Sequence, residues 1–403
     1  MSKSEYWKKL YERNVQIAAY LDQGCTIEFL IKKFELSRSE AYRLASLYAS
    51  GGLAALVPGS RARKQPQGTD ERIVDLICAL RTRLGLSADR IEEHLRERAE
   101  KLQIQPEQIP TARTVHRLLV QHQKIQPKVK PRRRAIVDYY RTRHGGYPNH
   151  IVESDLKCDR YVQRQRVNLF GHLEQFSRSV VASIHKEQTT RHCCENFLDY
   201  LYRYGIPEVA KSDNGAVYIG NERHPAFGIY TKLCLYLGIE QIFIPFAEPK
   251  WNVFIERFFR TWDEECFDKE RHPSWSALLR HHGRYLQKYN HQRTHQAIAK
   301  ATPDAYFQQH RSQIKQRFPN IDRDRLQRYL EEQNLPLKSG SVSFIRRVEA
   351  GGTIRLKTHT YTIGKALVNK HVKATVFVQA GQRKFDVLFW YKDMQLSKNT
   401  YAL

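Results

Sequence analysis

Apolar positions recur at helical spacing through the first 125 residues. In residues 5–56 they fall every three or four positions, in stretches separated by Gly24 and by the polar segment that starts at Ser37. Glycine commonly follows a helix and serine or threonine commonly caps one, so this segment predicts helices joined by short turns, with Thr26 and Ser37 as caps. Residues 68–123 repeat the pattern, and their last helix is expected to start after a capping Thr111.

The pattern changes to strand-like runs that alternate with helices after residue 147. Strands are expected at 151–156, 167–176, 179–185, a run ending at Asp213, and 239–244, with helices at 189–204, 227–237 and around Glu256. This order predicts an α/β core in which strand ends gather at one edge of a sheet.

The last part of the chain combines a helical segment with a series of short strand-like runs. Residues 276–333 are expected to be largely helical, and five short strands with glycine turns follow at 342–348, 353–356, 359–363, 371–378 and 384–390. Five short strands of this kind predict a small β-barrel.

Net charge is the most informative feature of the composition. The 403 residues carry 67 Lys and Arg against 42 Asp and Glu, a net charge of +25, which favours a nucleic-acid partner. A basic, proline-containing linker is expected at 124–146, where it could lie along phosphates. Its basic residues include Lys128, Lys130, Arg132, Arg133 and Arg134.

The sequence also argues against membranes and for a reducing compartment. No apolar run approaches the roughly 20 residues of a membrane-spanning helix, and the first residues do not resemble a signal peptide. Seven scattered cysteines without a Cys-x-x-Cys pair favour an intracellular, cytoplasmic protein without structural zinc.

The helical segments have the form of helix-turn-helix modules, in which a second helix enters the DNA major groove. Exposed candidates for DNA contact are Arg38, Ser39 and Arg43 in the first segment and Arg113 and Arg117 in the second. A plain helical bundle with solvated basic residues is the alternative for each segment.

Three acidic residues from distant parts of the chain are the candidate catalytic residues. Asp155 and Asp213 end strand-like runs, and Glu256 lies on a helix whose i, i+4, i+8 face also carries Asn252 and Arg260. Three carboxylates at strand and helix ends are a possible cage for hard divalent cations.

The order Asp155, Asp213-Asn-Gly and Asn252-x-x-x-Glu256-Arg resembles the Asp-Asp-Glu core of bacterial insertion-sequence transposases, which share a ribonuclease-H-like fold with retroviral integrases. The segments Glu174-Gln-Phe-Ser-Arg178, Tyr289-Asn-His-Gln-Arg-Thr-His295 and Thr302-Pro303 resemble further parts of that core. The resemblance covers roughly residues 148–307.

The sequence departs from the family pattern at two points. The interval from Asp213 to Glu256 is longer than usual, and the polar segment 220–225 is interpreted as a loop insertion. Glu248 has the more usual spacing, but it lies in Ala-Glu-Pro outside any helical run, so Glu256 is favoured. Glu174 replaces the family's usual Asp.

The resemblance implies six segments. They are a helix-turn-helix domain (1–57), a second one (68–123), the basic linker (124–146), an integrase-type catalytic core (147–310), a helical connector (311–340) and a small β-barrel (341–403).

Three carboxylates suit two-metal phosphoryl transfer, with two Mg²⁺ ions, replaceable by Mn²⁺, about 3.5–4 Å apart. Asp155 would bridge the ions, and Asp213 and Glu256 would each hold one. Lys250, Arg257 and Arg260 are candidates for phosphate contacts or simple surface charges.

The family's activity implies cleavage at element ends to expose a 3′-hydroxyl, which then attacks target DNA. The implied partners are double-stranded DNA, both element ends and target, and further copies of the chain assembled on paired ends at the bacterial nucleoid. Two alternatives stay open: a DNA-binding regulator that has lost catalysis, and a structure-selective nuclease that cuts without joining.

Overall fold

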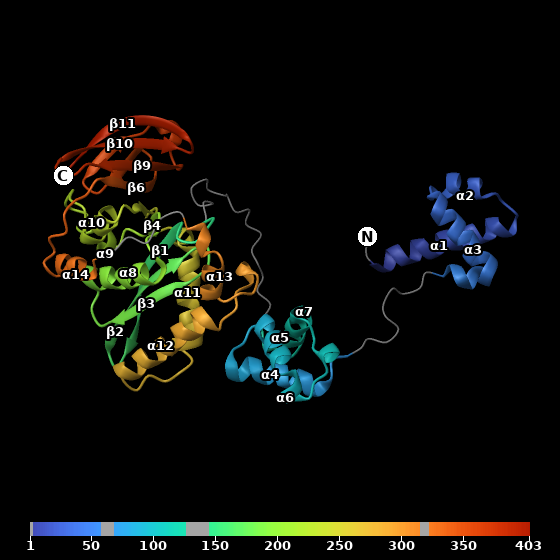
Figure 1. Cartoon of the computed structure of the whole chain (residues 1–403). Coiled ribbons are helices and arrows are strands. Elements are labelled where there is room, and N and C mark those ends of the chain that lie inside the picture. The colour runs from blue at the N-terminus through green and yellow to red at the C-terminus, as the bar shows by residue number, and fades with distance from the viewer. Residues whose placement is uncertain (1–2, 58–67, 126–144, 315–321) are drawn as a thin grey trace. The chain divides into compact units, whose positions relative to one another are not determined.

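A computed structural model describes residues 3–57, 68–125, 145–314 and 322–403 (Figure 1). The chain divides into two compact units, Met1–Pro127 and Lys128–Leu403, and each is described by itself.

Two separate helical cores form in the first unit. The first core contains Ile17, Leu30 and Leu44, and the second contains Ile77, Leu95 and Leu119. The helices of the first are α1 (Lys3–Asp22), α2 (Ile27–Phe34) and α3 (Arg38–Leu56). Those of the second are α4 (Glu71–Leu84), α5 (Ala88–Glu97), α6 (Ala99–Leu102), a 3₁₀ turn (Pro106–Gln108) and α7 (Ala112–Gln121).

The helix caps follow the sequence expectation with one exception. Thr26 and Ser37 accept hydrogen bonds from the backbone N–H groups three residues on, at 3.3 and 3.2 Å. Thr111 stands at the N-cap of α7 but makes no capping bond with its side chain. Its predicted role is taken by Glu92, whose carboxylate accepts a hydrogen bond from the Ala112 N–H at 2.7 Å.

The second unit is built around one large sheet. Its strands are β1 (Ile151–Val162), β2 (Gln165–Glu174), β3 (Val180–His185), β4 (Val209–Ser212), β5 (Glu240–Phe243), β6 (Gly340–Arg347), β9 (His371–Val378), β10 (Lys384–Tyr391) and β11 (Met394–Ala402). The order across the sheet is β11-β10-β9-β6-β5-β4-β1-β2-β3, and β7 (Thr353–Leu356) and β8 (His359–Thr362) form a separate hairpin.

Helices join these strands and cover the sheet. They are α8 (Thr190–Tyr204), α9 (Ala216–Ile219), α10 (Ile229–Tyr236), α11 (Val253–Trp262), α12 (Trp275–His291), α13 (Pro303–Gln309) and α14 (Arg323–Glu331). Short turns of 3₁₀ or π-helix span Pro249–Trp251, Asp263–Phe267, Gln296–Ile298, Arg311–Gln313 and Lys365–Leu367. All strands and helices expected for the core are present, and the expected insertion is an exposed loop before α10.

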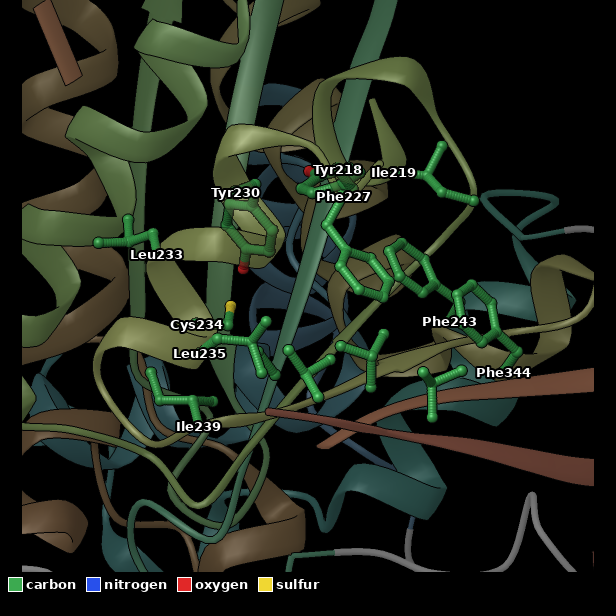
Figure 2. Close-up of a cluster of buried hydrophobic side chains, with 14 of the residues drawn as sticks. Tyr218, Ile219, Phe227, Tyr230, Leu233, Cys234, Leu235, Ile239, Phe243 and Phe344 are labelled. Carbon is green, nitrogen blue, oxygen red and sulfur yellow. The ribbon is translucent and has the colours of Figure 1, made fainter. Parts of the chain in front are cut away.

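The carboxy-terminal strands continue the core sheet, and the separate small β-barrel expected at 341–403 is not confirmed. Strand β6 pairs in parallel with β5, with Phe243 opposite Phe344 in register. The two rings stack with centroids 5.0 Å apart, and Figure 2 shows them in one cluster of buried side chains. Pairing β5 in this way also covers what would otherwise be an open edge of the core sheet.

The two faces of the sheet are covered by different helices (Figure 1). On one face, α8, α9 and α10 form a core that extends to the carboxy-terminal strands. On the other, α11 and α12 pack over β1, β2 and β3 in a second core that includes Phe258, Trp262 and Leu278. Within the described ranges, no helix combines the length and apolarity that crossing a membrane requires.

Candidate active site

Strand pairing places the first two acids next to each other. β1 and β4 are parallel, with Glu153 opposite Lys211 and Ser154 opposite Ser212. Asp155 and Asp213 each follow by one residue, at the carboxyl ends of this pairing. Because side chains alternate between the faces of a strand, both acids emerge on the face that carries Glu153 and Lys211.

A glycine lets the helix of the third acid approach this face closely. Gly171 of β2 is the cross-strand partner of Asp155. A Cβ atom built on Gly171 would lie 3.0 Å from Ile255 and 3.1 Å from Phe259. A larger residue would therefore push α11, and with it Glu256, away from the sheet.

Glu153 fixes the start of α11 and was not anticipated from the sequence. One of its carboxylate oxygens accepts hydrogen bonds from the N–H groups of Phe254 and Ile255, at 3.1 and 3.0 Å. The other lies 2.7 Å from Lys211 Nζ and accepts a hydrogen bond from Gln175 at 2.7 Å. A carboxylate at a helix N-terminus is favoured by the unsatisfied N–H groups and the helix dipole.

Asn252, which was expected to share the helix face of Glu256, instead precedes the helix. It occupies the N-cap position of α11 but makes no capping hydrogen bond with its side chain. The residue is almost fully buried, whereas Arg260 is exposed. The capping role that Asn252 could have had belongs to Glu153.

Replacing Glu153 by Gln should destabilise the second unit strongly. The amide would leave the mostly buried ammonium group of Lys211 without its counter-ion, which typically costs about 3–5 kcal/mol. We expect the loss in the free energy of unfolding measured in urea. Glu264→Gln is the control, because Glu264 is exposed and its replacement should stay within about 0.5 kcal/mol of wild type. Equal stability of the two variants would contradict this account of the cap.

Burial disfavours the ionised forms of all three acids. Burial raises the pKa of Asp155 well above its ordinary value, and the nearby charges of Asp213, Glu256 and Glu153 raise it further. The pKa of Asp213 is also raised by burial. Burial raises the pKa of Glu256, with the charge of Glu153 adding to the effect. A bound cation would reverse this penalty, because it favours the charged carboxylates.

Within the described ranges no ion pair joins Asp155, Asp213 or Glu256 to a basic side chain, although the charge of Arg260 partly offsets the rise in the pKa of Glu256. One oxygen each of Asp155 and Asp213 accepts a local backbone hydrogen bond, from Leu156 and Gly215. Three other basic side chains of β1 and β4 are engaged with different acids. Lys157 and Arg160 lie 3.0 Å from Asp263, and Lys211 pairs with Glu153.

This donor set fits a hard divalent cation in chemistry, since carboxylate oxygens are the ligands that Mg²⁺ prefers. In the conformation seen here, no three His, Cys, Asp or Glu side chains of the described ranges converge tightly enough to hold one ion. The half-buried Glu256 lines an adjacent hollow of about 450 Å³. Its side chain would have to turn toward Asp155 and Asp213 to complete a shared site.

The raised pKa values predict how stability depends on pH when divalent cations are absent. Each acid is protonated in both states below its unfolded pKa, so no penalty exists there. As pH rises from the unfolded pKa to the raised folded pKa, the unfolded state loses protons that the folded state keeps, so stability falls until the folded pKa is passed. Asp155→Asn should therefore raise Tm in EDTA at pH 8 by roughly 2–8 °C, equivalent to about 1–2 kcal/mol.

Thermal unfolding in EDTA, followed across pH, measures this difference. The difference in Tm between Asp155→Asn and wild type should disappear below about pH 4, near the pKa of an aspartate in the unfolded chain. Mg²⁺ should raise the Tm of wild type at pH 8 and leave that of the variant nearly unchanged. A variant less stable than wild type in EDTA at pH 8 would contradict the assignment.

The two candidates for the third acid, Glu256 and Glu248, have different neighbours in the structure. Glu256 is among the charges that raise the pKa of Asp155, and Glu248 is not. Glu248 lies 3.0 Å from His371 and accepts a hydrogen bond from the Trp251 indole at 2.8 Å. Its contacts join the loop before α11 to the carboxy-terminal strands.

The residues proposed to contact DNA are exposed wherever the structure describes them. Arg38, Ser39 and Arg43 lie in the first turns of α3, and Arg113 and Arg117 lie on α7. Lys250, Arg257 and Arg260 flank Glu256 in sequence and also face solvent. The linker candidates Lys128, Lys130, Arg132, Arg133 and Arg134 fall outside the described residues.

Comparisons with known proteins agree on the core. The family model described as "Integrase core domain" matches residues 237–303, a stretch that includes β5, α11 and α12. A Gag-Pro-Pol polyprotein of sheep pulmonary adenomatosis virus is 28% identical over 118 residues. That alignment covers 27% of this chain and only 6% of the polyprotein.

Integrases are among the solved structures to which this chain was matched. The HTLV-2 integrase catalytic core domain in complex with magnesium is 19% identical, with a TM-score of 0.32, and the match covers 40% of this chain and 99% of that one. The simian T-cell lymphotropic virus intasome with the PP2A regulatory subunit B56 gamma is 16% identical, with a TM-score of 0.36. That match covers 81% of this chain and 96% of the other.

Proposed function

We propose that the chain is a transposase that cleaves and joins DNA strands, because residues 237–303 match the model of the integrase core domain. The observation that supports the proposal is that the parallel pairing of β1 and β4 brings Asp155 and Asp213 to one edge of the sheet, where the charges of Asp213 and Glu256 raise the pKa of Asp155. A chain with a net charge of +25 can leave these three acids without an ion pair if their partner comes from outside.

The three carboxylates would hold two Mg²⁺ ions, for which Mn²⁺ could substitute. When bound, such ions activate the attacking oxygen and stabilise the leaving one at the phosphate. Asp155, the most buried of the three, would be shared between them. Glu153, Lys211 and Gly171 keep the helix of Glu256 against Asp155, so that the third ligand is available.

Exposed basic groups next to Glu256 would hold the DNA backbone. Lys250, Arg257 and Arg260 are the candidates, and each phosphate contact would make binding more sensitive to salt. The exposed residues of α3 and α7 would read the ends of the element, in the manner of helix-turn-helix modules. We further propose that several copies of the chain assemble on paired element ends. This assembly would take place in the bacterial cytoplasm, at the nucleoid.

A strand-transfer assay tests the function. Labelled duplexes carrying the DNA that brackets the reading frame would be mixed with the full chain, a target plasmid and Mg²⁺. We expect a shortened strand with a free 3′-hydroxyl, followed by a product joined to the plasmid, and neither product in EDTA. Unaltered DNA at every Mg²⁺ and Mn²⁺ concentration would support the regulator instead, and cut but unjoined DNA would support the nuclease.

A further inference from the structure

A buried arginine from the carboxy-terminal part of the chain reaches the candidate active site. Arg346, on β6, is 4% exposed. Within the described ranges no carboxylate forms an ion pair with it; burial lowers its pKa, and the charge of Glu222 offsets this only in part. Burying a guanidinium group without a carboxylate in direct contact is costly, so the position is not explained by packing alone.

The hydrogen bonds of Arg346 link the turn that carries Asp213 to residues in, or directly after, three neighbouring strands. One terminal nitrogen donates to the side-chain oxygen of Asn214 at 2.7 Å. The other donates to the backbone oxygens of Ile244 and Ile345, at 3.3 and 3.0 Å. Nε donates to the backbone oxygen of Arg355 at 3.2 Å.

Asn214 is consequently held at both ends of its amide group. Its nitrogen donates to the Ile244 oxygen at 2.7 Å, at the end of β5, while its oxygen accepts from Arg346. Asp213 immediately precedes it and accepts a hydrogen bond from Gly215 N–H at 2.9 Å. The turn is therefore clamped between β5 and β6, and the clamp leaves little freedom for the Asp213 carboxylate.

Aromatic rings enclose the guanidinium group. Its central carbon lies 4.6 Å from the ring centroid of Phe246 and 5.1 Å from that of Phe344. Phe344 belongs to the cluster shown in Figure 2, where it stacks on Phe243 of β5. These contacts fix the direction of the Arg346 side chain and exclude water from its hydrogen bonds.

We propose that Arg346 is a positioning residue of the active site, which sets the Asp213 carboxylate for metal binding by clamping Asn214. The inference rests on the proposed function, because it assumes that Asp213 is a metal ligand. It assigns to the carboxy-terminal strands a part in the catalytic centre that the separate barrel expected from the sequence would not have had.

The test compares Arg346→Met with Arg347→Met and uses Mn²⁺ alone as its first probe. Arg347 is the next residue on the same strand, is exposed, and bonds to Asn369 at 3.0 Å away from the turn. Mn²⁺ binding to the full chain, followed by electron paramagnetic resonance, should weaken about 10- to 100-fold in Arg346→Met. It should stay within about twofold of wild type in Arg347→Met.

A double-mutant cycle separates positioning from general destabilisation. Asn214→Ala should reproduce the loss of Mn²⁺ affinity, and the double variant should be no worse than either single one, because both changes break the same clamp. Additive losses would overturn the inference, as would an Arg346→Met protein with wild-type Mn²⁺ affinity. If Arg346→Met no longer unfolds cooperatively, the Mn²⁺ affinity of Asn214→Ala alone tests the inference.

Strand transfer, measured on the same proteins, keeps the two proposals apart. Wild type that binds Mn²⁺ but never joins DNA would overturn the proposed function, while the metal titration would still decide on Arg346. Wild type without any Mn²⁺ site would overturn both. Strand transfer that weakens in Arg346→Met and recovers partly at high Mn²⁺ is the expected result.

Discussion

Asp155→Asn should abolish DNA cleavage and joining while leaving DNA binding intact. Asp155 is the most buried acid of the site and interacts with both Asp213 and Glu256, so it is the ligand that two ions would share. Asparagine keeps the shape of the side chain but removes the charge that a cation needs. We expect strand transfer to fall at least about a thousandfold, equivalent to about 4 kcal/mol in the activation barrier.

Product formation on a sequencing gel measures this loss, and electrophoretic mobility shift measures binding. Asp386→Asn is the matched control, because Asp386 is exposed on β10 and pairs with Lys398 at 2.9 Å on the neighbouring strand. The control should keep full activity. If Asp155→Asn retains more than about a tenth of wild-type joining, Asp155 is not a shared metal ligand.

Deletion of residues 335–403 should unfold the core. Strand β6 pairs with β5, and Val342, Phe344 and Val376 share one buried cluster with Phe243. Each fully buried apolar side chain of this size contributes about 1.5–3 kcal/mol, so losing several exceeds the total stability of about 5–15 kcal/mol typical of a domain. The expected result is loss of the near-ultraviolet circular dichroism signal and of cooperative unfolding in urea.

Deletion of residues 1–57 provides the control for this truncation. That segment has its own core around Ile17, Leu30 and Leu44. The remaining chain should therefore stay folded and keep the cooperative urea unfolding of the full-length protein. A truncated protein ending at residue 334 that kept a native-like spectrum would contradict the single-sheet description. It would restore the separate carboxy-terminal domain expected from the sequence.

The elements of the core were predictable because their apolar patterns are strong and local. Strands β2 to β5 and helices α8 and α10 lie within a few residues of their predicted bounds, whereas β1 continues to Val162, beyond its predicted end at residue 156. The pairing of β5 with β6 was not predictable, because it joins positions about a hundred residues apart and leaves no local signal. Strand β11 was missed because Met394–Ala402 is mostly polar and lies at the edge of the sheet.

The three acids of the candidate site could be chosen from the sequence, but the residues that hold them in place could not. Glu153 was passed over as part of an apolar-leaning run, although a charged residue inside a buried strand was the available signal. Arg346 carried no such signal, since an arginine near the end of a strand is ordinarily solvated. Their roles depend on contacts with α11 and Asn214 that only the fold reveals.

Anomalous X-ray scattering from Mn²⁺, in crystals of the full chain bound to DNA, tests the central claim most directly. The account predicts two manganese peaks, both ligated by Asp155, with Asp213 on one ion and Glu256 on the other. Manganese bound at other residues, or Asp155, Asp213 and Glu256 still apart and unligated with DNA in place, would contradict it.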